Sequence, residues 1–239
     1  MNNTQANSVN ENERIQREQP GYYPGWDVMS QVAYWDAATR NLVEERLAPP
    51  KPLRFFSEAE ALTMTALLDR VLPQDDRVPS SRIPLLPTLD ARLYENRIEG
   101  YRYEDMPSDQ QAYRWAVESL DAMAEEAFNA SFAKLTSHSQ ELLLKSLHDG
   151  EPMAAKMLWQ RMNVKRFWTL LVNDAAAAYY AHPLSWNEIG FGGPAYPRGY
   201  MRLEEGEAEP WEFTEQRYPW SAPANSVSDQ DGSGSGDND

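Results

Sequence analysis

Apolar residues recur at helical spacing from about residue 57 to residue 181, and this periodicity predicts a domain built from α-helices. The first helix is predicted to follow Ser57, which forms a capping-box pattern with Glu60, and to end at about Leu72. Four more helices are predicted over residues 85–98, 108–128, 136–149 and 152–181. Because these segments fill the region, we expect almost no strand. The predicted fold class is all-α, an irregular helical bundle.

The last predicted helix, over residues 152–181, is expected to be the longest and to lie at the centre of the bundle. Its apolar residues face more than one side, a pattern typical of a helix that other helices surround. Small residues at 175–178 would allow another backbone to approach closely. The His182-Pro183 pair is predicted to end this helix.

Residues 182–203 are predicted to form an ordered strap without regular structure. Glycines, among them Gly190, Gly192 and Gly193, and three prolines interrupt the segment and disfavour a continuous helix. Its large aromatic side chains are Trp186, Phe191, Tyr196 and Tyr200. The strap is expected to lie on this protein's own helices, and its outer side would also suit another polypeptide; the sequence leaves both possibilities open. A phosphate-binding glycine loop is disfavoured, because no strand precedes the glycines.

Residues 21–54 are predicted to form an arm that lies on the main domain or on a partner. Asp36 is expected to cap a short helix that runs to about Arg46. Leu42, Val43 and Leu47 are predicted on its apolar side. Prolines follow the helix and end it, and a single short helix cannot form a core alone.

Composition divides the remaining chain. Residues 1–20 are polar and predicted to be disordered. Residues 55–220 are predicted to hold the helical domain and the strap, with alternating acids and aromatics after residue 203. Residues 221–239 are predicted to form a flexible acidic tail.

The net charge of −15 argues against binding to nucleic acid or to anionic membrane surfaces. No window approaches the roughly 18 apolar residues that a bilayer-spanning helix needs, so no direct membrane insertion is expected. The N-terminal residues lack the apolar core and the arginine pair of export signals. Localisation stays open between the cytoplasm and the periplasm, the latter by export with a signal-bearing partner.

The sequence offers little of the usual chemistry of active sites. Because it has no cysteine, thiolate metal sites and cysteine nucleophiles are excluded. Its three histidines form no Glu-x-x-His pair, and neither a Gly-x-Ser-x-Gly nor a Walker A motif occurs. Asp75 and Asp76 are predicted to lie in a solvated turn. His182 is expected to form a hydrogen bond within the strap. We therefore predict no catalytic, cofactor-binding or metal-binding residue in this chain.

Three segments together resemble the gluconate 2-dehydrogenase subunit 3 family. They are FFSEAEALTMTALLDRVLPQDD from Phe55, HPLSWNEIGFGGPAYPRGY from His182, and Pro-Trp-Glu at 210–212. A long helix that ends in the pair Tyr179-Tyr180 adds to the likeness. The most specific part is Trp186–Pro194, and the resemblance covers about residues 55–212.

The resemblance implies a small, non-flavin subunit of a sugar dehydrogenase complex, often periplasmic or membrane-associated. Its partner would be a large FAD-dependent GMC-type oxidoreductase that acts on a sugar, sugar acid or glycoside. A cytochrome c subunit often accepts the electrons in such complexes. FAD is then expected in the partner and no cofactor in this chain. Many family members carry a twin-arginine signal, which is missing here.

We predict that this chain binds, stabilises and helps mature or export the flavoprotein. The alternatives are a transient folding or export chaperone and, less favoured, an independent helical metalloenzyme. Residues predicted near the partner interface are aromatic or lie beside aromatics in the arm and the strap: Trp26, Trp35, Trp186, Phe191, Pro194, Tyr196, Tyr200 and Trp211.

Overall fold

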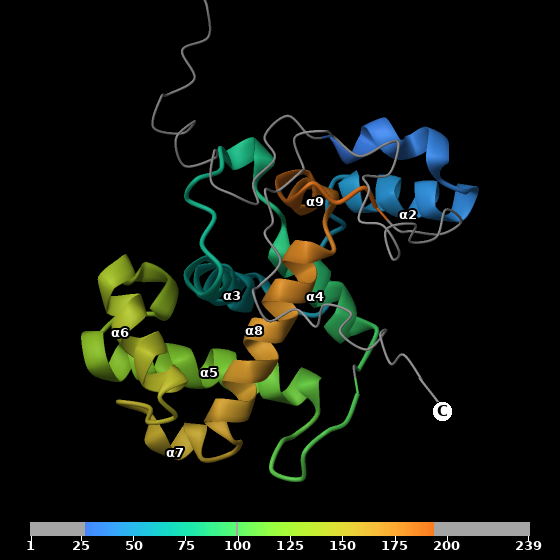
Figure 1. Ribbon diagram of the computed structural model, residues 1–239. Helices are drawn as coiled ribbons and strands as arrows, with labels where there is room; N and C mark the ends of the chain where they lie inside the picture. The colour runs from blue at the N-terminus through green and yellow to red at the C-terminus, as the bar shows by residue number, and fades with distance from the viewer. Residues whose placement is uncertain (1–26, 99, 194–239) are drawn as a thin grey trace, which may run out of the picture.

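The computed structural model describes residues 27–98 and 100–193, and within them every regular element is a helix (Figure 1). The all-α prediction is confirmed. Predicted segments 1–20 and 221–239, the strap beyond residue 193, and the interface candidates Trp26, Pro194, Tyr196, Tyr200 and Trp211 lie outside the described residues. The elements in chain order are η1 (Val28–Tyr34), α2 (Ala37–Leu47), α3 (Glu58–Val71), η2 (Pro79–Ser81), α4 (Leu85–Tyr94), α5 (Asp109–Phe128), η3 (Phe132–Lys134), α6 (Ser137–His148), α7 (Lys156–Trp159), α8 (Val164–Tyr180) and α9 (Pro183–Ile189).

Helix α8 crosses the middle of the domain and contacts α3, α4, α6 and α9 (Figure 1). Its buried face carries Phe167 and Leu171, and Ala175 and Ala178 continue that face toward α9. The ring of Phe167 meets the edge of Tyr113 from α5 at 5.5 Å. Each large side chain of this kind stabilises the fold by about 1.5–3 kcal/mol when it leaves water. Helix α8 therefore contributes its buried face to the core of the domain.

Helix starts agree with the predicted caps. The side chain of Asp36 accepts a hydrogen bond from the Thr39 N–H, and Ser57 and Glu60 form a complete capping box. Ser108 begins α5 and Thr136 begins α6 in the same way. Each cap gives an otherwise unpaired N–H an acceptor, which is why such residues fix helix starts.

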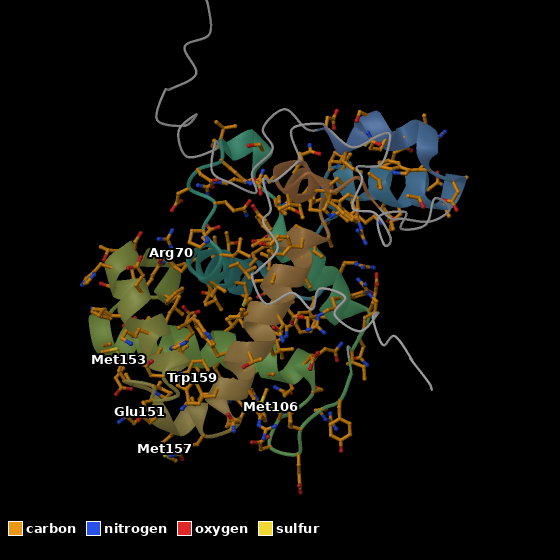
Figure 2. All side chains as sticks on the ribbon, in the orientation of Figure 1. Arg70, Met106, Glu151, Met153, Met157 and Trp159 are labelled. Carbon is orange, nitrogen blue, oxygen red and sulfur yellow. The ribbon has the colours of Figure 1, made fainter. Side chains whose placement is uncertain are left out.

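The prediction of one long helix over residues 152–181 is wrong. The chain forms the short helix α7, turns, and begins α8 at Val164, so α5 is the longest helix among the described residues. Asn163 causes the break, because its side chain accepts from the Arg166 N–H and caps a new helix. Figure 2 shows Met157 at the outer edge of the domain and Trp159 further inside, where it is 2% exposed.

Helix α4 also ends earlier than predicted, at Tyr94 rather than near Ile98. Asn96, two residues after the helix end, takes a left-handed conformation with φ of 50°, which a continuing helix would not allow.

The predicted strap contains a helix, so the expectation of irregular structure is wrong for residues 183–189. Pro183 ends α8 but occupies the first turn of α9, where its missing N–H costs nothing. The arm helix α2 matches its prediction in extent, but its buried residues are Thr39 and Val43. Leu42 and Leu47, predicted on the apolar side, are exposed.

No helix among the described residues is both long enough and apolar enough to cross a membrane.

Candidate functional site

The arm packs against α9, and the two form a small unit at one end of the domain (Figure 1). We call this unit, composed of η1, α2, α9 and residues 190–193, the clasp. Its apolar centre consists of Val28, Trp35, Val43 and Trp186, and all four are buried. The rings of Trp186 and Phe191 meet edge to face at 5.4 Å. The clasp thus brings together three of the predicted interface residues from opposite ends of the described chain.

Polar contacts also tie the arm to the domain. The Val28 N–H donates to Oδ1 of Asn187 over 2.8 Å. Nη1 of Arg46 donates to the carbonyl oxygen of Ala181 over 2.8 Å, and its guanidinium lies 5.7 Å from the ring centre of Trp186. Because Ala181 follows α8, Arg46 places a positive charge where a helix end attracts cations. The arm therefore binds both by apolar packing and by charge.

Trp35 covers the backbone at the end of α9. Its Nε1–H donates weakly, at 3.4 Å, to the carbonyl oxygen of Gly192. A Cβ at Gly193 would stand only 3.1 Å from the Trp35 ring, and the φ of Gly193 is +88°. Glycine suits this position on both counts, because other residues would be strained and would push the ring away.

Helix α9 is held by contacts with its own start. Nδ1 of His182 accepts from the Leu184 N–H at 3.2 Å, so the predicted hydrogen bond of His182 within this segment is confirmed. Burial, followed by the charges of Arg77 and Arg46, lowers the pKa of the His182 imidazole to about 4. The imidazole is therefore neutral near pH 7 and serves as a cap. Trp186 donates from Nε1 to the Tyr180 carbonyl at 2.6 Å.

Arg77 anchors α9 to the body of the domain. It is buried, forms an ion pair with Glu188, and donates to the Tyr179 hydroxyl at 3.3 Å and to the Ser81 carbonyl at 2.9 Å. The Tyr179 hydroxyl donates to Glu188 at 2.7 Å, and burial together with this bond raises the pKa of Tyr179 to about 12.

The sequence analysis missed this role of Arg77. Asp75 and Asp76 are exposed, as predicted, but the same loop buries Gln74 and Arg77. Gln74 exchanges two hydrogen bonds with the backbone of Ile83, which closes the loop. The flanking prolines were the only nearby sequence signal of an ordered loop. No neighbouring residue indicates that Arg77 is buried.

A second, partly buried polar network joins three helices of the body. Arg92 of α4 binds Asp174 of α8 and Asp109 of α5, and the Tyr113 hydroxyl donates to Asp174 at 2.6 Å. Burial raises the pKa of the Asp174 carboxyl, although Tyr113 and Arg92 partly oppose that rise. Each member bonds to another, so the network is suited to fixing helix positions.

A cavity of about 670 Å³ lies beside the loop between α4 and α5. Tyr101, Tyr103 and Arg166 are among its lining residues. Ser108 and Asp109 also line it, but Ser108 caps α5 and Asp109 binds Arg92. These two residues are therefore not arranged as a nucleophile with its base. Within residues 27–98 and 100–193, no group of three or more His, Asp or Glu side chains is placed to hold a metal ion.

The predicted interface residues that the structure describes are mainly internal. Trp35 is 6% exposed and Trp186 is 5% exposed, and each is covered by the other part of the clasp. Phe191 is half-buried beside them. Large apolar side chains do remain exposed on the same elements and at the end of α8: Leu42, Leu47, Tyr180 and Ile189.

Comparison with known proteins gives one clear relationship. The family model described as gluconate 2-dehydrogenase subunit 3 matches residues 58–193, which is more than half of the chain and extends from α3 to the turn after α9. Neither the curated proteins nor the solved structures yield a match. The arm lies before the matched segment, whereas Trp186, Gly193 and the Arg77 anchor lie within it. The chain belongs to the gluconate 2-dehydrogenase subunit 3 family.

Proposed function

We propose that this chain is a non-catalytic small subunit that binds a large FAD-dependent GMC-type oxidoreductase. The observation that carries this proposal is the family match over residues 58–193. The partner would oxidise a sugar, a sugar acid or a glycoside, and would hold the FAD. A cytochrome c subunit is a further candidate partner, as electron acceptor. In the complex, this chain would stabilise the flavoprotein and assist its maturation or its export to the periplasm.

The clasp is the surface that we assign to the partner. An interface of this kind needs a compact apolar centre, commonly aromatic, with a polar rim. Leu42, Leu47 and Ile189 are exposed apolar groups of the clasp, and Tyr180 is exposed at the end of α8. Trp35 and Trp186 would support the interface from beneath, by fixing the position of the arm. Trp26, Pro194, Tyr196, Tyr200 and Trp211 complete the proposed set.

Co-expression with a GMC-type flavoprotein encoded beside this chain's gene tests the proposal. With a tag on this chain, we expect the flavoprotein to copurify in equal amount and to carry the bound flavin. A flavoprotein that reaches full activity and solubility without this chain, and never copurifies with it, would contradict the proposal. A chain needed for flavin loading but absent from the active enzyme would identify a transient chaperone instead.

The isolated chain provides a second test. Under the proposal it oxidises no sugar, sugar acid or glycoside without the flavoprotein, whichever electron acceptor is supplied. Elemental analysis of the same sample addresses the metalloenzyme alternative, which predicts one equivalent of a transition metal. Turnover by the isolated chain, or stoichiometric metal, would assign the catalysis to this chain.

A further inference from the structure

A cavity of about 550 Å³ is lined by the segment that connects α6 to α8 and by the first turn of α8. All of its lining residues fall between Gly150 and Lys165. Two of them, Glu151 and Trp159, lie near α7 on the same side of the domain (Figure 2). The volume falls in the range of small-molecule sites, roughly 300–1,000 Å³. It therefore gives room for a ligand with a body as well as a head group.

The indole of Trp159 lines this cavity and carries an unused hydrogen-bond donor. Trp159 is 2% exposed, and its Nε1–H has no acceptor among the described residues. Buried polar atoms of Gln31, Arg77 and Arg92 also lack a partner, but these side chains form hydrogen bonds through their other atoms. Indole has a single polar atom, so Trp159 leaves its whole hydrogen-bonding capacity unused. A buried donor in this state is costly to the fold and calls for an acceptor.

The start of α8 adds two backbone donors. Asn163 and Val164 line the cavity, and the Asn163 side chain accepts from the Arg166 N–H at 3.1 Å. The N–H groups of Val164 and Lys165 have no acceptor within the helix, because they belong to its first turn. Asp105 bonds to Asn163 and Arg166 but does not line the cavity. Since α8 has 17 residues, its N-terminus presents these donors with the partial positive charge of the helix dipole.

Two lysines add positive charge to the same lining. Neither Lys156 nor Lys165 forms an ion pair with a described residue, although acidic residues outnumber basic ones by 37 to 22 in this chain. The stem of Lys165 lies across Gly150, whose φ is +77° and where an added Cβ would collide with the lysine. Glu151 is the acidic residue of the lining. The lining thus carries two positive charges and one negative charge, which favours an anion.

Apolar side chains complete the cavity. Met162 is buried, Pro152 and Val164 are half-buried, and all three belong to the lining. A neutral ligand would leave the charge of the lysines unanswered, and an inorganic anion would leave the apolar side chains uncovered. An organic anion matches both parts of the lining, because its head accepts hydrogen bonds and its body covers apolar surface.

We propose that this cavity binds a small organic carboxylate. The carboxylate head accepts from the Trp159 indole and from the first N–H groups of α8, and Lys156 and Lys165 neutralise its charge. The apolar body of the ligand lies on the apolar side chains of the lining. The site belongs to elements of the body and not to the clasp, so the proposal goes beyond the proposed function and does not depend on the flavoprotein.

The test uses the ¹⁵N-labelled full-length chain with sodium hexanoate as the probe. Trp159→Phe, which lacks the N–H, identifies the Trp159 signal among the indole resonances of the eight tryptophans. We expect hexanoate to shift this signal saturably, and the uncharged hexan-1-ol to shift it little. Inorganic phosphate, which has charge but no apolar body, should bind about tenfold more weakly than hexanoate. Trp159→Phe itself should weaken hexanoate binding about tenfold, because it removes a donor to a charged acceptor.

Charge variants of the lining test the same site by isothermal titration calorimetry. Lys165→Met keeps the apolar stem over Gly150 but removes the charge, and should weaken hexanoate binding about threefold. Glu151→Gln removes the opposing charge and should strengthen binding about twofold. Lys134→Met, at an exposed lysine outside the lining, is the matched control and should leave the affinity unchanged. Circular dichroism checks each fold, and the charge variants carry the test if Trp159→Phe does not fold.

The opposing outcomes are distinct. A Trp159 signal that does not respond to hexanoate would overturn the proposal. Equal responses to hexanoate and hexan-1-ol would also overturn it, since the site would then select apolar surface alone. The same holds if Lys165→Met, Glu151→Gln and the wild-type chain bind hexanoate with one affinity. None of these results bears on the flavoprotein, because the chain is studied alone and copurification tests that partner separately.

Discussion

The body and the clasp are both helical, but they are stabilised to different degrees. In the body, Phe167 packs between Tyr113 and Trp159 within one continuous core shared by α3 to α8. In the clasp, Val43 and Trp35 meet Trp186 in a cluster of four buried residues. Because hydrophobic stabilisation scales with buried area, the body should unfold as one unit and the clasp should open locally.

This difference shows how one short chain combines a rigid part with an adaptable part. Polar side chains join the helices of the body, as in the Arg92 network. The clasp is joined to the body by polar contacts that include those of Arg77 and Arg46. A docking surface drawn from the less stable part can adjust to a partner without loss of the fold.

The largest expected effect comes from truncation in the body core. Phe167→Ala should lower the free energy of unfolding by about 3–5 kcal/mol, because it removes a buried ring and leaves a cavity. Urea denaturation followed by circular dichroism measures this change. Phe128→Ala is the matched control, since Phe128 is 37% exposed, and it should change the stability by less than about 1 kcal/mol. Similar losses for both would contradict a single continuous core.

Substitution of Asp90 should have the second largest effect on stability. This buried carboxylate of α4 accepts from the backbone N–H groups of Arg54, Phe55 and Phe56 at 2.7–2.9 Å, and so fixes the chain where the body begins. Asp90→Asn places an amide NH₂ against these donors and should cost about 2–3 kcal/mol of unfolding free energy.

Chemical denaturation again measures the effect, and Glu125→Gln, at an exposed position, serves as the neutral control for the Asp90 substitution. An Asp90→Asn chain as stable as wild type would show that these three bonds contribute nothing net.

Val43→Ala tests the clasp directly. Its loss of buried methyl groups should cost about 1–2 kcal/mol, but only in the opening of the arm. Hydrogen exchange of α2 should then speed up about tenfold while exchange in α5 and α8 stays the same. Leu42→Ala removes an exposed side chain of the same helix and should leave exchange unchanged. Uniformly faster exchange after Val43→Ala would mean that arm and body unfold together.

The smallest expected effect is the pH dependence of local opening at α9. His182 has a folded-state pKa of about 4, lowered from its usual 6.5, so the unfolded state binds the proton more tightly. The stabilising contribution of neutral His182 is complete above pH 6.5 and is lost as the pH falls toward 4. Solvent reaches part of the imidazole, which reduces this effect. Hydrogen exchange of residues 184–189, corrected for intrinsic rates, should therefore show increased opening between pH 6.5 and pH 4.

His182→Asn is the control for that experiment. Asparagine keeps an acceptor for the Leu184 N–H but has no proton to gain in this range. Its exchange rates should depend less on pH than those of wild type. An equal pH dependence in both chains would assign the effect to other groups.

Local signals in the sequence predicted helix starts better than helix ends. Asp36, Ser57, Ser108 and Thr136 each cap a helix, because a cap needs only its own side chain and the next N–H groups. The break at Asn163 was missed, since the apolar pattern continues across it and the cap competes locally with the helix.

The predicted interface shows the same limit. Aromatic content singled out Trp35 and Trp186 as interface candidates, but their burial against each other depends on contacts between residues 151 positions apart. The spacing of apolar residues predicted Leu42 on the apolar side of α2, because that spacing depends only on which residues are apolar. The orientation of α2 on α9 was decided by Arg46 and by Trp35, which no local pattern predicts.

The sequence by itself determined the helical class, most helix starts and the family, because these depend on neighbouring residues and on a recognisable motif. Only the tertiary structure decided that the arm packs on α9, that Arg77 is buried, and that position 193 has no room for a side chain. These features arise where distant segments meet, and the free energy of such contacts depends on packing between surfaces that the linear order of residues does not specify.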